Sequence, residues 1–554
     1  MTRTMVMAVG VAALACALFF TGLGSLPLFD VDEAVFAEAT REMIQSGEWI
    51  TPQYNGTDRF DKPILFYWLM ASAFILFGVG EWSARFWSAT WGVGLVVLIV
   101  VFGWRRVGPR AGLLAGLVAA TSLEVIVLAH SAITDMTLIL FLSGGLLAFY
   151  GAIQDRSGAS NHRAVIGSAL LGLAVLTKGP VGLLIPALII AAFLALRGGF
   201  LDTIQRLPWR AMATVFALVV IPWYALELHA RGWSFIDGFF LKHNVRRFTG
   251  VISGHAGSVY YYIPVVAIGF FPWTAFLVPA GRWAWPSGWR GLRNPTDREA
   301  LGLFLLVWVG TVFVFFSLAG TKLPNYVASL YPPLALMVGV WADRWVGTER
   351  SDRWVAGGLT VLVVVSLGLA VALGGIPWWL DWARERFPGT PYLQQAIDVG
   401  AGPRWLAATC VVGALTIVGL AVMRRRAAAI GAVAMTTAVV TVVLLTHVAP
   451  VAASVMQTPL RDLSLRASRE LTDDDVLAVY GLNKPSVAFY SRRLVTVVGE
   501  SHFEEIAALF AQERRCYVIT KAAWIDRWRD VPSFRVLEIR GGYLLASNEK
   551  EKGL

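Results

Sequence analysis

The sequence contains few charged residues and few cysteines, and each of these features excludes several classes of protein. Only 15% of the residues are charged and 56% are hydrophobic, whereas about 25% charged is ordinary for soluble domains. This composition excludes a disordered chain, a coiled coil and an ordinary cytosolic enzyme, and leaves a membrane protein. The three cysteines, Cys16, Cys410 and Cys516, lie far apart, so they indicate neither a disulfide framework nor a thiolate metal site.

Long apolar runs recur along the chain and predict about thirteen membrane-spanning helices. The first run follows a short N-terminus and lacks a small-residue cleavage site, so we expect a retained span rather than a signal peptide. The expected spans are a first one ending near residue 28 and then 83–104, 111–129, 132–152, 164–177, 180–196, 210–228, 259–281, 300–318, 324–341, 354–374, 405–423 and 427–448.

One further apolar run, residues 63–79, is interpreted from the distribution of arginine. Cytoplasmic loops of membrane proteins carry the excess of Lys and Arg. If residues 63–79 form an interfacial or re-entrant helix in the first outer loop, the arginine-rich loops and the N-terminus all fall on the cytoplasmic side. We therefore expect an interfacial or re-entrant helix there, and an outer location for the C-terminal end of the chain.

The hydrophobicity falls after Pro450, where short β-branched runs alternate with helical stretches. We predict a membrane domain over residues 1–449 and a small α/β domain on the periplasmic side over residues 450–554. That tail has 15 basic and 14 acidic residues, so nearly all of the net charge of +10 belongs to the membrane part. There the charge sets topology, and nucleic acid is not needed to explain it. The tail has no phosphate-binding glycine motif, and we expect no nucleotide cofactor. The expected elements are strands at 476–480, 494–498, 517–520 and 534–539 and a helix at 503–510.

The unusual polar residues all fall on the outer side in this topology, as one site would require. Asp32 and Glu33 precede a helix expected at 34–45, where acidic residues are ordinarily N-caps. Asp61 and Lys62 follow in the same loop, where a solvated ion pair is the alternative.

Other outer turns add a carboxylate and several cations. Asp135 begins an apolar run, where a charged residue is costly and therefore a functional candidate, although a helix cap is the alternative. Paired arginines suit a phosphate, and a histidine can bind a metal or carry a proton. For the lysines and the tyrosine, snorkelling and interfacial placement are the alternatives. These residues are Lys178, His243, Arg246, Arg247, Lys322 and Tyr326.

Together these segments resemble the aminoarabinose transferase family, type C glycosyltransferases (GT-C) related to the protein O-mannosyltransferases. The resemblance implies an all-α polytopic fold plus an outer C-terminal domain. It also implies transfer, with inversion, of 4-amino-4-deoxy-L-arabinose or a similar sugar from undecaprenyl phosphate to lipid A phosphate, at the periplasmic face of the bacterial inner membrane. The segments are Asp32–Glu33 with the following helix, Asp61–Pro63, Asp135, Lys178–Pro180, His243–Asn244, Arg246–Arg247 and Lys322–Tyr326.

The same resemblance implies roles for individual residues and a monomer in the bilayer. Asp32 and Asp135 are the expected catalytic carboxylates, Glu33 orients the acceptor, and Asp61 with His243 holds a divalent metal such as zinc. The family commonly has Arg-Tyr where this chain has Val35 and Phe36, so a protein or another glycan remains an alternative acceptor. The expected ligands of the donor phosphate are Lys62, Lys178, Arg246, Arg247, Lys322 and Tyr326.

Two other classes of function compete with a transferase. A lipid-phosphate transporter or flippase would have charged residues near mid-membrane in both halves and an internal repeat, and the sequence shows neither. A structural membrane protein whose outer domain binds a partner leaves the acidic cluster around Asp32 unexplained.

Overall fold

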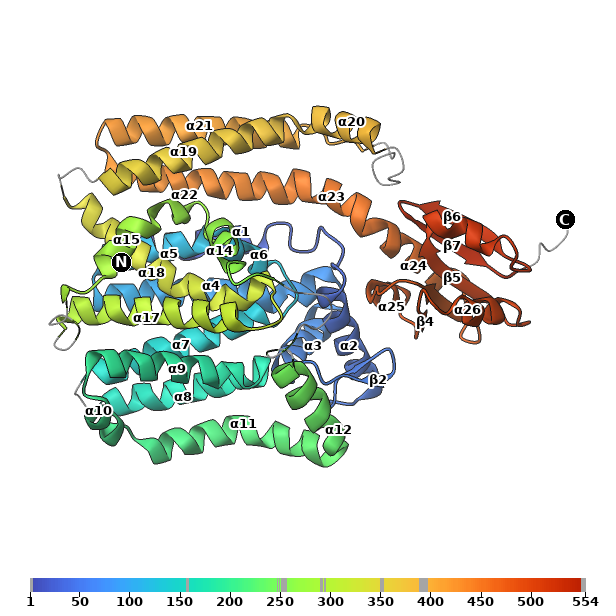
Figure 1. Cartoon of the computed structure of the whole chain (residues 1–554), viewed down its shortest axis with the longest axis horizontal. Helices are drawn as coiled ribbons and strands as arrows, with labels where there is room; N and C mark the ends of the chain where they lie inside the picture. The colour runs from blue at the N-terminus through green and yellow to red at the C-terminus, as the bar shows by residue number, and fades with distance from the viewer. Residues whose placement is uncertain are drawn as a thin grey trace.

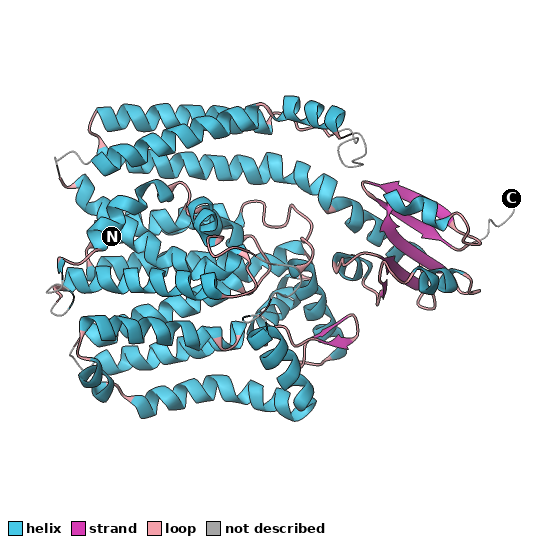
Figure 2. Ribbon diagram, in the orientation of Figure 1, coloured by secondary structure: helices cyan, strands magenta, loops and turns pink. Residues whose placement is uncertain are grey.

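The chain forms one bundle of helices with a small sheet-containing domain beyond one end (Figure 1). Apart from a short hairpin, the strands belong to that C-terminal domain (Figure 2). This computed structural model describes residues 3–155, 159–246, 248, 250, 257–288, 292, 295–348, 353–387 and 397–549.

The long helices run side by side in the bundle, and shorter helical segments connect them at its two ends. The bundle helices are α1 (Arg3–Phe20), α4 (Glu81–Arg106), α5 (Pro109–Ala120), α6 (Leu123–Ala129), α7 (Asp135–Gln154), α8 (Ala159–Lys178), α9 (Val181–Arg197), α11 (Trp209–Arg231), α14 (Tyr262–Gly269), α15 (Leu277–Ala284), α17 (Asp297–Leu318), α18 (Tyr331–Val346), α19 (Arg353–Gly374), α21 (Gly402–Val422) and α22 (Arg426–Val443). The shorter segments are α2 (Asp32–Ser46), α3 (Leu65–Phe77), α10 (Phe200–Arg206), α12 (Trp233–Phe235), the π-helix η1 (Ile236–Arg246), η2 (Trp273–Phe276), η3 (Pro324–Leu330), α20 (Ile376–Arg386), η4 (Leu444–Val448) and α23 (Ala449–Met456).

Among the described residues, seven helices are long and apolar enough to cross a membrane, or nine if each of two bent pairs is one span. The prediction of a multi-pass, mostly helical membrane protein is confirmed. The expected spans at 111–129 and 259–281 are not straight, because α5 and α6 meet at 64° and α14 meets the η2–α15 segment at 104°. A count of apolar residues gives the length of a run and carries no information about its direction.

The two bent segments contact each other at their bends. The backbone N–H of Leu123 donates to the carbonyl of Phe271 (3.3 Å), and the indole N–H of Trp273 donates to the hydroxyl of Thr121 (3.0 Å). The first bond satisfies backbone groups that a break in a helix leaves without partners inside a membrane, and the second joins two side chains across the bends.

The first outer loop folds into two helices and a hairpin. The helix expected at 34–45 is α2, which ends where Gly47 adopts a left-handed φ of 73°, a conformation that favours glycine. The hairpin pairs β1 (Gln53–Tyr54) with β2 (Thr57–Asp58). The 13 residues of α3 reach about 20 Å, which is too short for a bilayer core of about 30 Å, as an interfacial helix requires.

The C-terminal domain has one five-stranded sheet in the order β4-β3-β5-β7-β6, with β3 parallel to β4 and β5, and β7 antiparallel to β5 and β6. Alternate residues of its central strands belong to two separate cores: α24 and α25 cover one face and α26 covers the other. The expected strands and helix are present, and the sequence interpretation missed α24, α25 and β7. The elements are α24 (Thr458–Glu470), β3 (Val476–Tyr480), α25 (Ser486–Ser491), β4 (Thr496–Val498), α26 (Phe503–Phe510), β5 (Cys516–Lys521), η5 (Ala522–Trp528), β6 (Arg535–Arg540) and β7 (Tyr543–Ser547).

Close packing of α18 against α5 gives a test of the bundle. A Cβ at Gly339 would lie 2.4 Å from the backbone N and Cα of Ala115, whereas a Cβ at Gly310 would have nothing within 4 Å. Because the backbone of α5 cannot move locally, we expect Gly339→Leu to cost about 1–3 kcal/mol of unfolding free energy, measured by unfolding in detergent. Gly310→Leu is the matched control, and equal losses in the two variants would contradict this packing.

Candidate functional site

A cavity of about 440 Å³ brings most of the predicted site residues together. Its polar end is formed by the first outer loop, the start of α7, the end of α8, the π-helix η1 and η3. The residues there that the sequence predicted are Asp61, Lys62, Asp135, Lys178, His243 and Tyr326, and Asn244 and Asn325 accompany them.

The other part of the cavity is apolar. Aliphatic residues of α7 and α9, such as Leu138 and Val181, line it. Aromatic residues of η1 and α17, such as Phe239 and Phe316, complete it. Leu184, which also lines it, is 45% exposed, so the apolar part reaches the outer surface of the bundle. The cavity therefore joins a charged end to a slot that a hydrocarbon chain can enter.

Asp135 is held by two partners from distant parts of the chain. Its Oδ1 lies 2.5 Å from Nζ of Lys178, and its Oδ2 accepts a hydrogen bond from Nδ2 of Asn325 (2.9 Å). The Lys178 ammonium also lies over the ring of Tyr326, 5.5 Å from its centroid. The side chains of Lys178 and Asp135 are only 13% and 4% exposed. Because burial of either charge alone is costly, each offsets the cost of burying the other, and the carboxylate holds the ammonium at the cavity.

Asp61 forms a second polar group with His243 and Arg59. Its Oδ1 lies 2.7 Å from Nε2 of His243, and its Oδ2 lies 2.7 Å from Nη2 of Arg59. Burial alone would raise the pKa of Asp61, but the hydrogen bond from His243 and the charge of Arg59 hold this pKa below its ordinary range. Asp61 is therefore ionised at neutral pH.

Arg59 is a site residue that the sequence reasoning missed. Its Nε donates to the hydroxyl of Tyr67 (3.2 Å), and its guanidinium lies over the ring of Phe36. Burial alone would lower the pKa of Arg59, but Tyr67, Asp61 and Asp32 raise it above its ordinary value. Its place two residues before Asp61 was the available signal, and only the fold shows that it pairs with Asp61 and interacts electrostatically with Asp32.

Asp32 is an exposed residue in the first turn of α2. It is outside the lining of the cavity, and the charge of Arg59 links it electrostatically to Asp61. The catalytic role expected for Asp32 remains a prediction.

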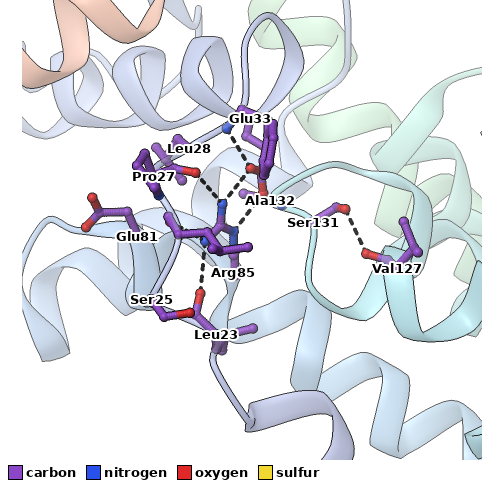
Figure 3. Close-up of polar contacts among 12 residues, drawn as sticks. Leu23, Ser25, Pro27, Leu28, Glu33, Glu81, Arg85, Val127, Ser131 and Ala132 are labelled. Carbon is purple, nitrogen blue, oxygen red and sulfur yellow. Dashed lines mark hydrogen bonds and ion pairs between the residues drawn. The ribbon is translucent and has the colours of Figure 1, made fainter. Parts of the chain in front are cut away.

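Glu33, in contrast, belongs to a buried structural ion pair (Figure 3). Its two carboxylate oxygens accept hydrogen bonds from Nε and Nη2 of Arg85 (2.8 and 2.7 Å), and also from the backbone N–H groups of Phe29 and Ala132. Burial by itself would raise the pKa of Glu33, but Arg85 and these N–H groups lower it. With both oxygens engaged, Glu33 anchors α2 to the bundle, and this placement does not support the acceptor-orienting role expected for it.

Lys322 is also placed for a structural role. Its ammonium donates to the carbonyls of Ser317 and Ala319, each at 2.8 Å, at the C-terminal end of α17. A cation there satisfies carbonyls that the helix leaves without partners and opposes its dipole. The donor-phosphate role predicted for Lys322 is therefore not supported, because the side chain is only 5% exposed and turns toward the helix end.

Arg246, the first of the paired arginines in the long outer loop, is not among the described residues that line the cavity. Arg246 is exposed, with 65% of its side chain accessible and Asp237 at 3.9 Å. Arg247 lies outside the described residues. A phosphate role for either arginine remains a prediction.

The metal prediction rests on the pair of Asp61 and His243. Their donor atoms are of the kinds that zinc accepts, and Nδ1 of His243 is buried without a hydrogen-bond partner. Over the described part of the chain, no group of three His, Cys, Asp or Glu side chains is placed to hold a metal ion. The pair thus fits a metal in kind of ligand and falls short of the three or four protein ligands usual for zinc.

Comparison with known proteins confirms the resemblance that the motifs indicated. The model of the dolichyl-phosphate-mannose-protein mannosyltransferase family matches residues 61–225. Undecaprenyl phosphate-alpha-4-amino-4-deoxy-L-arabinose arabinosyl transferases are similar to this chain: that of Aeromonas hydrophila is 30% identical over 62% of this chain and 63% of its own length, and that of Enterobacter sp. is 30% identical over 65% and 64%. The matched stretch is less than two thirds of the length of these relatives.

Solved structures confirm the fold over nearly the whole chain. The crystal structure of ArnT from Cupriavidus metallidurans bound to undecaprenyl phosphate has a TM-score of 0.80 at 24% identity and covers 98% of both chains. The archaeal oligosaccharyltransferase AglB from Archaeoglobus fulgidus, in complex with an inhibitory peptide and a dolichol-phosphate, has a TM-score of 0.55 at 13% identity, and covers 100% of this chain and 75% of that one. The expected GT-C architecture is therefore confirmed.

The ion pair of Glu33 with Arg85 provides a test of how α2 is anchored to the bundle. We expect Arg85→Ala to cost about 3–5 kcal/mol of unfolding free energy, because it leaves a buried carboxylate unpaired. The double variant Glu33→Leu/Arg85→Met should lose less, since both charges are gone. Unfolding in detergent is the measurement, and Arg529→Ala, which removes an exposed pair with Asp526, is the control, expected to cost under about 1 kcal/mol. A small loss for Arg85→Ala would contradict the anchoring role.

Proposed function

We propose that this chain is a membrane-embedded glycosyltransferase. It moves 4-amino-4-deoxy-L-arabinose or a similar sugar from undecaprenyl phosphate to a lipid A phosphate or a related membrane acceptor. The observation that carries the proposal is the cavity itself, with Lys62, Lys178 and Asp135 at one end and an apolar slot opening to the surface of the bundle at the other. A phosphate on a long isoprenoid chain has this same division between charge and hydrocarbon. The names of the similar transferases and the undecaprenyl phosphate bound to the structural relative support it.

The chemistry assigned to these residues is a single displacement with inversion at the anomeric carbon. As the sugar–phosphate bond breaks, negative charge grows on the leaving undecaprenyl phosphate while the sugar becomes cation-like. Lys62 and Lys178 stabilise that growing charge, and Asp135 keeps Lys178 in place through the 2.5 Å contact. Asp32 orients the acceptor. It serves as the base if the acceptor is a hydroxyl, whereas an acceptor phosphate is already ionised and needs only to be positioned.

The proposed topology has thirteen crossings, a cytoplasmic N-terminus, and a periplasmic active site and C-terminal domain in the bacterial inner membrane, where the protein acts as a monomer. Figure 1 supports it, because α2, α3 and β2 of the first outer loop lie at the same end of the bundle as the C-terminal sheet. The arginine-rich loops assigned to the cytoplasm agree with the positive-inside rule.

A divalent metal such as zinc remains part of the proposal, with Asp61 and His243 as its protein ligands. When bound, it would neutralise charge on the leaving phosphate. No step assigned to Lys62, Lys178 or Asp32 depends on it.

The match to the mannosyltransferase family model favours one alternative, a protein or other glycan acceptor for the same lipid-linked donor. A lipid-phosphate flippase is a weaker alternative, since the charged residues of the cavity gather at one end. Mass spectrometry of lipid A and of membrane glycans, with and without this protein, identifies the acceptor. Movement of the lipid in liposomes that lack any acceptor would favour a flippase.

The central test is transfer by the purified protein in liposomes containing the donor and lipid A. We expect Asp32→Asn to abolish transfer while donor binding and expression persist, because the carboxylate is removed without loss of volume. Lys178→Met should instead weaken donor binding and lower kcat, by about tenfold or more, through the lost phosphate interaction. Transfer retained by Asp32→Asn would count against the assigned role, and no transfer by the wild-type protein with any tested acceptor would overturn the proposal.

The metal is tested separately by elemental analysis of protein purified without chelators. We expect about one zinc per chain in the wild type, and loss of it in His243→Ala, since two ligands are too few to tolerate removal of one. His502→Ala, on the exposed surface of the C-terminal domain, is the control. Equal zinc in wild type and His243→Ala would remove His243 from the metal proposal.

A further inference from the structure

The C-terminal domain contacts the first outer loop immediately before α2. The side chain of Asp30 is fully buried there, with 0% exposure. Its Oδ1 accepts a hydrogen bond from the backbone N–H of Ser486 (2.8 Å), and its Oδ2 accepts one from the Ser486 hydroxyl (2.6 Å). Asp30, two residues before Asp32, is thereby bound to α25 of the other domain.

A second contact lies at the opposite end of α2, through the tip of the β1–β2 hairpin. Nδ2 of Asn55 donates to the carbonyl of Val495, and the N–H of Val495 donates to Oδ1 of Asn55, both at 2.7 Å. The same tip is bound to α2, because the carboxylate of Glu42 accepts the backbone N–H groups of Asn55 (2.6 Å) and Gly56 (3.1 Å).

A third contact joins the C-terminal domain to the loop before α2 and to the bundle helix α4. The hydroxyl of Tyr490 accepts a hydrogen bond from the backbone N–H of Leu28 (2.8 Å) and donates one to Oε1 of Glu81 (3.0 Å). Tyr490 belongs to α25 and Glu81 to α4, so the segment that leads to Asp32 lies between the C-terminal domain and the bundle.

We propose that the C-terminal domain is a positioning element of the transferase, and that Ser486 and Asn55, with Asp30, are positioning residues for Asp32. The inference rests on the proposed function. Asp32 itself is exposed, and the residues on both sides of it are fixed: Asp30 by Ser486, and Glu33 by Arg85. Of the three contacts with the C-terminal domain, those of Asp30 and Asn55 hold the start of α2 and, through Glu42, its last turns, so they set where the Asp32 carboxylate stands relative to the cavity.

The physical reason is that transfer needs the acceptor, the anomeric carbon and the carboxylate in one geometry. A displacement of about 1 Å caused far from the reacting atoms can cost on the order of a hundredfold in rate. The donor binds through its phosphate and its hydrocarbon chain, which meet Lys62, Lys178 and the apolar slot, and none of these belongs to the C-terminal domain. Loosening the contacts should therefore reduce kcat and leave the affinity for the donor nearly unchanged.

The experiment uses the full-length protein in liposomes and the double variant Ser486→Ala/Asn55→Ala. We expect kcat to fall by about ten- to a hundredfold, with KM for the sugar donor within about twofold of wild type, as expected for an interaction that matters in the transition state alone. Ser486→Thr/Asn55→Ala should recover part of the loss, because threonine restores the hydroxyl. Ser501→Ala, whose hydroxyl contacts only the neighbouring His502 on the surface of the same domain, is the control and should match wild type.

Unchanged kcat in the double variant, beside an active wild type, would overturn the inference and leave the proposed function intact. A raised KM with unchanged kcat would also overturn it, because the domain would then act in donor binding. If the double variant does not fold, as judged by its thermal midpoint in detergent, Ser486→Ala alone gives the same comparison, since the backbone N–H bond to Asp30 remains. An inactive wild type is a separate outcome that overturns the proposed function itself.

Discussion

The buried ion pair between Glu33 and Arg85 is the constraint on which the arrangement of the outer end depends. Two charges removed from water at this depth are tolerated only because all of their hydrogen-bonding capacity is used. The carboxylate accepts from Arg85 and from the backbone of Ala132, while the guanidinium donates to the carbonyls of Leu23, Leu26 and Pro27. One pair thus ties the start of α2 to α4 and to the turn before α7, where Asp135 begins.

The cavity has an apolar part and a charged part, which differ in the side chains that line them. Aromatic and aliphatic side chains of α7, α9 and α17 form one part, and polar and charged residues of the first outer loop, the start of α7, the end of α8 and η1 form the other. Asp135 and Asp61 are both engaged with cations or an imidazole, so neither is a bare charge next to hydrocarbon. In contrast, Asp32 stands exposed outside the lining, on a segment whose neighbouring residues Asp30 and Glu33 are held by Ser486 and Arg85.

Hydropathy and charge placement predicted the membrane bundle, the helix α3 and most strands of the C-terminal sheet, because each depends on patterns within a short stretch of sequence. The motifs also predicted that Asp61, Asp135, Lys178 and His243 converge. The sequence could not show which groups each side chain contacts in the folded chain. Glu33 and Lys322 looked like site residues by type, and only the fold reveals the arginine and the helix end that engage them. Ser486 gave no such signal, and Arg59 gave only its place two residues before Asp61, since the importance of both lies in contacts made across the chain.

The last span has a mechanical consequence. The helix from Arg426 to Met456 has 31 residues and is about 47 Å long, well beyond a hydrocarbon core of about 30 Å. Pro450, in the first turn of α23, is tolerated there, so the helix continues past the expected domain boundary and leads directly into α24. A stiff rod of this kind transmits its inclination to whatever it carries. Because the C-terminal domain that it carries is also bound to the loop before α2 and to α4, a change in bilayer thickness, which alters helix tilt, is opposed by those contacts.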